Sequence, residues 1–145
     1  MSDSFQDALA GLAAIVGDKH VIASGADQEP YVVDWRGRYR GRAVAVVKPG
    51  STAEVASVVK YCADRRLAIV PQGGNTGMCG AATPDDHAGN VVIRLDRMRA
   101  VRDVSPLANT ITVEAGCILA EVQAAATAAD RYFPCLLYTS DAADE

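Results

Sequence analysis

Hydrophobic and polar positions follow two different periods along this chain, and the period at each place predicts the element found there. Near the N-terminus, apolar side chains recur at helical spacing and Gly17 supplies a stop. The apolar positions of this helix are Phe5, Leu9, Leu12 and Val16. Residues 18–42 show no such period, and Pro30 together with the polar stretch 34–38 favours irregular chain. We therefore predict an N-terminal helix followed by a connector without regular structure.

A strand, a helix and a second strand come next, in the order of a βαβ unit. The unbroken apolar runs Ala43–Val47 and Leu67–Val70 predict strands buried on both faces. Between them, Ser51 and Glu54 form a capping box, in which each side chain satisfies a free backbone N–H at the start of a helix. The predicted apolar face of this helix holds Val55, Val58, Val59 and Cys62.

The rest of the chain predicts a third strand, a hairpin and a last helix. Val91–Leu95 is apolar and follows a loop at 71–90. Val101–Val104 and Asn109–Glu114 flank turn residues and predict a hairpin with a half-exposed second arm. The last helix carries Leu119, Val122, Ala126 and Ala129 on one face. The fold class is α/β with an α+β layout: a βαβ unit plus further strands and helices.

The composition fits a globular chain and narrows its partners. Half of the 145 residues are hydrophobic and the formal net charge is −4. The absence of a Lys or Arg run argues against nucleic acid and anionic membranes as binding partners. The apolar stretch at 8–16 is too short to span a membrane, and acidic residues precede it where a signal peptide has basic ones. We expect a cytoplasmic protein. The cysteines at 62, 79, 117 and 135 fit no metal motif, so we expect free thiols and no metal.

The last eleven residues, 135–145, do not resemble the rest of the chain. They read Cys-Leu-Leu-Tyr-Thr-Ser-Asp-Ala-Ala-Asp-Glu. A nucleotide string that encodes them resembles the transposon-end adapter used in preparing sequencing libraries. We expect this segment to be translated adapter, not native protein, and the gene to continue past Pro134.

The stretch Pro71–Gly77 holds the most chemical information, because it directly follows a predicted buried strand. It reads Pro-Gln-Gly-Gly-Asn-Thr-Gly. Its glycines and asparagine permit left-handed backbone angles, so that successive N–H groups can point into one concavity and hold an anion. Gln72 and Thr76 can add side-chain donors. Small residues continue through Gly80 and Ala81 and keep a surface open for a flat ligand.

On these residues alone, two interpretations of the loop stay open. The loop lacks the Lys-Ser/Thr ending of a P-loop and the Gly-x-Gly-x-x-Gly spacing of a Rossmann turn. A phosphate cradle of another kind fits, and so does a plain glycine-rich turn.

Beyond these patterns, Pro-Gln-Gly-Gly-Asn-Thr-Gly-Met, with Pro84 downstream, resembles the pyrophosphate loop of FAD-linked oxidases of the p-cresol methylhydroxylase (PCMH) type. Within that superfamily the likeness is greatest to the D-2-hydroxyglutarate and D-lactate dehydrogenase group. The flanks 48–55, 94–98 and 112–117 resemble the same family, so the resemblance covers residues 34–134. Ala81 departs from the pattern, since the family usually has glycine there; alanine is small, and we expect crowding without loss of the cofactor.

The resemblance implies a domain organisation and a set of binding residues. Residues 1–33 become an N-terminal helix and connector, and 34–134 the truncated N-terminal part of a PCMH-type FAD-binding domain. The implied cofactor-binding residues are Pro71, Gln72, Gly73, Gly74, Asn75, Thr76, Gly77, Gly80 and Ala81. Many relatives bind FAD covalently through a histidine in or near the Gly-Gly loop. Asn75 offers no imidazole nitrogen, so we expect non-covalent FAD.

The implied reaction moves a hydride from C2 of a D-2-hydroxy acid to the flavin and gives a 2-oxo acid. The family's catalytic residues lie mostly in a C-terminal domain, so none is assigned here, and the sequence names neither the hydroxy acid nor the electron acceptor. A nucleotide-diphosphate-binding module without redox chemistry and an inactive truncated fragment remain alternatives. We expect His87 to be solvated, and Trp35 and Arg36 to pack against the FAD-binding part.

Overall fold

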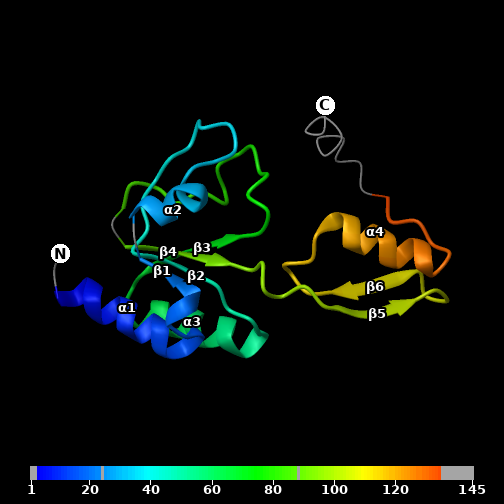
Figure 1. Cartoon of the computed structure of the whole chain (residues 1–145), viewed down its shortest axis with the longest axis horizontal. Coiled ribbons are helices and arrows are strands. Elements are labelled where there is room, and N and C mark those ends of the chain that lie inside the picture. Colours follow the sequence, from blue (N-terminus) through cyan, green and yellow to red (C-terminus); the bar gives the residue numbers. More distant parts are fainter. Residues whose placement is uncertain (1–2, 24, 88, 135–145) are drawn as a thin grey trace.

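The computed structural model describes residues 3–134 apart from residues 24 and 88. Its elements form two lobes joined by residues 95–100 (Figure 1). The first lobe holds α1 (Asp3–Val16), the 3-10 helix η1 (Asp18–His20), β1 (Val21–Ile22), α2 (Gly25–Val32), β2 (Ala45–Val47), α3 (Thr52–Asp64), β3 (Ala68–Gln72) and β4 (Asn90–Arg94). The second lobe holds β5 (Val101–Ser105), β6 (Thr110–Val113) and α4 (Leu119–Ala128). The predicted mixed fold of helices and strands is confirmed. The segment 135–145 lies outside the described residues, and its adapter origin stays a prediction.

The first lobe is built on a four-stranded sheet in the order β1-β2-β4-β3. β2, β4 and β3 run parallel, and β1 pairs antiparallel with β2. The predicted βαβ unit is therefore present as β2-α3-β3, with β4 inserted between its two strands. Helices α1 and α3 cover one face of the sheet, and α2 lies over the other (Figure 1).

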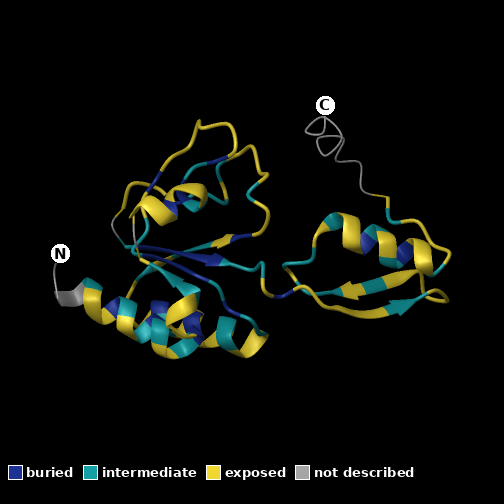
Figure 2. Ribbon diagram, viewed as in Figure 1, coloured by how far each residue is buried: buried dark blue, intermediate teal, exposed yellow. Residues whose placement is uncertain are grey.

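The core of the first lobe lies between the sheet and the helices α1 and α3. Figure 2 shows buried residues concentrated in this lobe. Leu12 and Val16 of α1 join the same core as residues of β2 and β4, so the chain before residue 34 and the chain after it fold around one core. The predicted helix ends where expected, since Gly17 has a φ of 87° that side chains with a Cβ resist.

The capping box of α3 forms with one change of partner. The Ser51 hydroxyl accepts a hydrogen bond from the N–H of Glu54 at 3.2 Å, as predicted. The Glu54 carboxylate accepts from the N–H of Gly50, one position before the cap. Val58 and Cys62 are buried, but Val59 is 40% exposed. Successive helical residues are about 100° apart, so Val59 lies at the margin of the buried stripe.

The prediction of an irregular connector over residues 18–42 is wrong. This segment contains η1, β1 and α2. The helix α2 has no apolar period of its own, and tertiary hydrogen bonds hold it in place. The Gln28 amide donates to the carbonyl of Ile22 at 2.9 Å. The side chains of Gln72 and Asn75 donate to backbone carbonyls at the C-terminal end of α2. Sequence periodicity carries no signal for such bonds.

The strand β3 differs from its predicted environment. Its residues Ala68 and Pro71 are exposed because β3 is an edge strand, whereas β2 and β4 have neighbours on both sides and are buried, as predicted. An edge position also accommodates Pro71, which has no N–H to donate. The strand continues to Gln72, which pairs with Arg94, so the predicted loop begins two residues later than expected.

The second lobe is the predicted hairpin covered by the last helix (Figure 1). Ile111 and Val113 alternate with more exposed neighbours along β6, as the sequence predicts. Val122 and Ala126 of α4 are buried. The backbone N–H of Gly116 donates to the carbonyl of Met98 at 2.9 Å, and a Cβ on Gly116 would lie 1.8 Å from the Leu95 oxygen. Only glycine at position 116 permits the segment before α4 to lie this close to residues 95–100, which join the two lobes.

Candidate functional site

The three parallel strands β2, β4 and β3 all end on the same side of the sheet, which we call its carboxyl edge. Lys48 follows β2, Gly73 follows β3, and Leu95 and Asp96 follow β4. Ligands of open α/β sheets bind outside this edge. The segment 73–82, which we call the glycine loop, leaves the sheet at this place.

Left-handed backbone occurs in the glycine loop at Asn75 and Gly80, with φ of 59° and 76°. Gly73, Gly74 and Gly77 do not have positive φ, so the left-handed angles that glycine permits are not used at these three positions. A Cβ placed on Gly73 or Gly77 meets nothing within 4 Å, and one on Gly74 meets only Thr76 Cγ2, at 3.7 Å. Protein packing does not require these glycines, and they leave an open surface that a ligand can approach.

The Gln72 side chain is part of the scaffold of the loop. It is 1% exposed, and its Nε2 donates to the carbonyls of Tyr31 and Ala82, both at 2.8 Å. These two bonds use both N–H groups of the amide. The expectation that this side chain donates to a phosphate is therefore wrong, although it fixes both ends of the loop.

Asn75 makes a second connection between the loop and the end of α2. Its Nδ2 donates to the Val33 carbonyl at 2.8 Å and lies 3.4 Å from the Pro30 carbonyl. Asparagine tolerates the left-handed region better than most residues with a Cβ. The same residue thus provides both the bend of the loop and its attachment.

A cluster of charged side chains lies beside the first glycines. Arg94 Nη1 donates to the Gly73 carbonyl and, at 3.3 Å, to Gln72 Oε1. Asp96 Oδ2 accepts from Arg94 Nε at 3.5 Å and from Lys48 Nζ at 3.3 Å. Among the described residues, Asp96 Oδ1 is buried and accepts no hydrogen bond.

This cluster leaves an excess of positive charge at the edge of the sheet. Burial lowers the pKa of Lys48, but hydrogen bonding to Tyr31 and the charge of Asp96 outweigh it, and the pKa lies above its usual value. Lys48 and Arg94 also lie over the Tyr31 ring, 5.1 and 5.6 Å from its centre. Lys48 is therefore charged at neutral pH, and its hydrogen bond to Asp96 holds it beside Arg94.

Two cavities flank the glycine loop and share Gly74 and Arg94. The first, of about 560 Å³, extends from the loop to the second lobe. Its lining residues are Gly73, Gly74, Thr76, Arg94, Asp96, Arg99, Ala115, Gly116, Cys117, Ile118 and Leu119. The second, of about 540 Å³, lies toward the end of α2 and is lined by Glu29, Pro30, Tyr31, Val33, Asp34, Trp35, Gly74, Asn75 and Arg94. Together they offer room for an elongated ligand that crosses the loop at Gly74.

The structure brings together part of the predicted set of binding residues. Gly73, Gly74, Asn75 and Thr76 line the two cavities. Gly80 lines a third cavity with Tyr39, and Gly77 and Ala81 are exposed. Pro71 is paired within β3.

Sequence reasoning assigned no role to Lys48, Arg94 and Asp96 in the site. Each stands at the carboxyl end of a strand, which is a usable signal once the strands are known to be parallel. Trp35 was expected to pack against the domain, but it is 56% exposed, carries Arg36 over its ring and borders the second cavity. The prediction for His87 is confirmed, since its side chain is 87% exposed.

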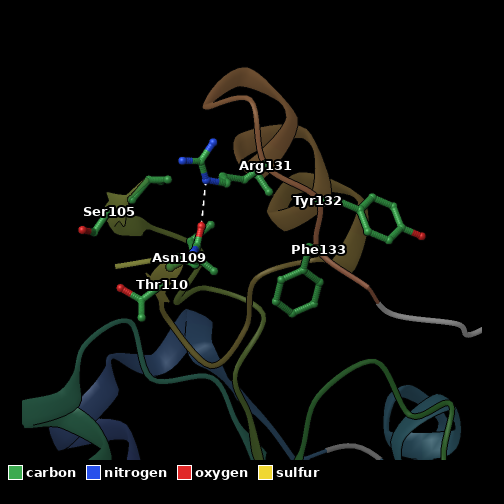
Figure 3. A pocket seen from close by; sticks show the side chains of 9 residues that line it. Ser105, Asn109, Thr110, Arg131, Tyr132 and Phe133 are labelled. Carbon is green, nitrogen blue, oxygen red and sulfur yellow. Dashed lines mark hydrogen bonds between the residues drawn. The ribbon is translucent and has the colours of Figure 1, made fainter. Parts of the chain in front are cut away.

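A smaller cavity, of about 190 Å³, lies on the second lobe and is lined by none of the predicted cofactor-binding residues (Figure 3). Arg131 borders it and donates to Asn109 Oδ1 at 2.8 Å and to the Pro106 carbonyl. These bonds fasten the end of α4 to the hairpin turn. The arginine therefore has a structural role there, and we assign the candidate site to the glycine loop.

No helix within the described part of the chain has the length and apolar character needed to cross a membrane. Among the described residues, no group of His, Cys, Asp and Glu has the arrangement of a metal site. Cys62, Cys79 and Cys117 are free thiols in the structure.

In a comparison with known families, residues 43–143 match a family described as FAD binding domain. Among curated proteins, the chain is 34% identical over 128 residues to D-2-hydroxyglutarate–pyruvate transhydrogenase of Saccharomyces cerevisiae, covering 87% of this chain and 25% of the relative. It is 39% identical over 106 residues to a probable mitochondrial D-2-hydroxyglutarate dehydrogenase of Oryza sativa, covering 73% and 19%. A D-2-hydroxyglutarate dehydrogenase of Xanthomonas citri is 36% identical, with 75% and 23% covered. The chain thus spans at most about a quarter of the length of these relatives.

Solved structures show the same fold at lower identity. Substrate-bound p-cresol methylhydroxylase superposes with a TM-score of 0.75 at 21% identity, covering 90% of this chain and 26% of that protein. Alkyldihydroxyacetonephosphate synthase superposes with a TM-score of 0.73 at 20% identity, covering 83% and 24%. These matches confirm the predicted PCMH-type fold.

Proposed function

The chain belongs to the FAD binding domain family, and we propose that it supplies the pyrophosphate-binding part of an FAD-dependent oxidoreductase acting on D-2-hydroxy acids. The whole protein would oxidise the hydroxy acid to a 2-oxo acid. The relatives named as D-2-hydroxyglutarate dehydrogenases support this substrate class. The observation that carries the proposal is the glycine loop at the carboxyl edge of a parallel sheet, beside the cations Lys48 and Arg94.

The residues at this edge fit FAD. The open faces of Gly73 and Gly74 allow a phosphate to approach the backbone, where N–H groups act as partial positive charges. Two cavities on either side of Gly74 give an elongated dinucleotide room to extend in both directions. The buried Asp96 Oδ1 is an acceptor without a donor among the described residues, and the hydroxyl groups of a dinucleotide can supply one.

In this proposal, the chain binds and orients the cofactor. The backbone of Gly73, Gly74, Asn75 and Thr76 holds the pyrophosphate, and Gln72 holds the loop in shape through Tyr31 and Ala82. Gly77, Gly80 and Ala81 belong to the same loop, and Pro71 lies in β3 just before it. When bound, the flavin supplies the acceptor for the hydride that leaves C2 of the hydroxy acid. Asn75 gives no covalent attachment point, so FAD is held without a covalent bond.

The test is to express the complete gene, purify the protein and record its visible spectrum. We expect a yellow protein whose flavin is bleached anaerobically by D-2-hydroxyglutarate or D-lactate and not by the L-enantiomers. A colourless protein that binds another nucleoside diphosphate would support a binding module without redox chemistry. A yellow protein that no D-2-hydroxy acid bleaches would contradict the substrate class.

The sequence predicts a cytoplasmic location, and we keep that as a proposal. The names of the rice and cattle relatives include "mitochondrial", whereas that of the Xanthomonas relative gives no compartment. Cell fractionation followed by detection of the protein decides between the two.

A further inference from the structure

We propose that Arg94 is a positioning residue that sets the orientation of the Gly73–Gly74 peptide and so determines how tightly the loop holds a pyrophosphate. This inference rests on the proposed function, because it concerns the same loop. It adds a residue outside the glycine loop whose effect on the ligand acts through the loop backbone.

The orientation follows from the geometry of one peptide unit. Peptide bonds are planar, and no described bond of this chain is cis, so the C=O and N–H of a unit point in opposite directions. Arg94 Nη1 binds the Gly73 carbonyl oxygen. The N–H of Gly74 therefore points away from the guanidinium. While Arg94 holds the Gly73 oxygen, that oxygen cannot turn toward an anion bound on the N–H side of the peptide.

The orientation of the Gly73–Gly74 peptide depends on Arg94 because few other contacts restrain it. Both of its residues are glycine, which rotates between backbone conformations at low cost. Cβ atoms built on Gly73 and Gly74 meet almost nothing, so side-chain packing gives no restraint. A peptide turned by half a rotation would present its oxygen to the phosphate and repel it.

Arg94 is itself held in a fixed position. Its Nε binds Asp96 Oδ2, which is shared with Lys48, and its Nη1 also reaches Gln72 Oε1. The side chain is only 20% exposed. A guanidinium holds such partners through a rigid planar fork, whereas an ammonium is a single point of charge. Arg94→Lys would keep the charge and lose the fork.

The experiment compares FAD with riboflavin, which lacks the pyrophosphate. Apoprotein prepared from the complete protein is titrated with each, and binding is followed by quenching of flavin fluorescence. For Arg94→Met we expect the Kd for FAD to rise roughly 10- to 100-fold, in the range of a lost charged hydrogen bond. The Kd for riboflavin should change by less than about 3-fold, and Arg94→Lys should resemble Arg94→Met. The matched control is Arg65→Met, which removes an arginine that lies over the Tyr61 ring.

The outcomes separate this inference from the proposed function. A wild-type protein that binds neither flavin contradicts the proposed function. If the wild type binds FAD and Arg94→Met binds it equally well, the positioning role is wrong. The same holds if both flavins lose affinity by one factor, which would indicate general damage to the fold. If Arg94→Lys retains full affinity, charge alone acts and the positioning role is again wrong.

Discussion

The side-chain amide of Gln72 donates a 2.8 Å hydrogen bond to the backbone carbonyl of Tyr31, which lies 41 positions earlier in the chain. The same nitrogen binds the Ala82 carbonyl at the far end of the glycine loop. One buried side chain therefore connects the end of β3, the last turn of α2 and both ends of the loop. The shape of the candidate site depends on this connection.

Gln72→Leu should lower the free energy of unfolding by roughly 2–4 kcal/mol, because the carbonyl groups of Tyr31 and Ala82 lose the donor that the buried side chain supplies. Urea denaturation of the variant and the wild type measures this difference. Gln6→Leu is the control, since Gln6 is exposed on α1 and surface substitutions usually change stability by less than about 0.5 kcal/mol. Equal effects from the two substitutions would contradict the structural role of Gln72.

Gly74→Val should abolish FAD binding with little loss of stability. The backbone of Gly74 has no positive φ, and the space around its missing Cβ is open, so valine can be accommodated by the protein. Its methyl groups would occupy the surface that a phosphate approaches. Isothermal titration with FAD measures the loss, and Gly25→Val, where a Cβ also meets nothing, should bind FAD normally. Tight FAD binding by Gly74→Val would place the pyrophosphate elsewhere.

Acidification should open the turn around Trp35. A hydrogen bond from the N–H of Tyr39 holds the pKa of Asp34 below its usual value against the opposing effect of burial, and the N–H of Arg36 adds to it. A depressed pKa contributes stability that is present above the usual pKa, near about 3.9, and is lost as the pH falls through the folded pKa.

Trp35 is the only tryptophan of the chain, so its fluorescence reports on this turn. We expect a fluorescence transition below about pH 4. Asp34→Asn should remove that transition, and Asp27→Asn, on the exposed side of α2, should retain it. A transition that persists in Asp34→Asn would assign it to another group.

FAD should leave the denatured protein, because Asn75 offers no nucleophilic nitrogen to a flavin methyl group. Its side-chain nitrogen donates instead to the Val33 carbonyl. Acid precipitation of the purified holoprotein, followed by centrifugation, should leave the yellow colour in the supernatant. Colour that stays with the pellet would show a covalent bond and contradict this interpretation of the loop.

The sequence by itself determined the elements with strong local patterns and the identity of the loop. The apolar runs of β2 and β4, the capping box of α3 and the alternation along β6 depend on neighbours within a few residues, so their periods predict them. The loop was recognised from the eight consecutive residues 71–78. Its backbone angles were not, because Asn75 and Gly80 take the left-handed positions that composition also allowed at the other glycines.

Only the tertiary structure decided α2, the edge position of β3 and the cluster around Arg94. The helix α2 lacks an apolar stripe and is held by bonds from Gln72 and Asn75, both more than 40 positions away in the chain. β3 and β2 follow each other along the chain, but β4 lies between them, so burial along β3 could not be inferred from its apolar run. Lys48, Arg94 and Asp96 meet because parallel strands end at the same edge. Strand order and long-range hydrogen bonds arise from packing of the whole lobe, and a local pattern contains no information about them.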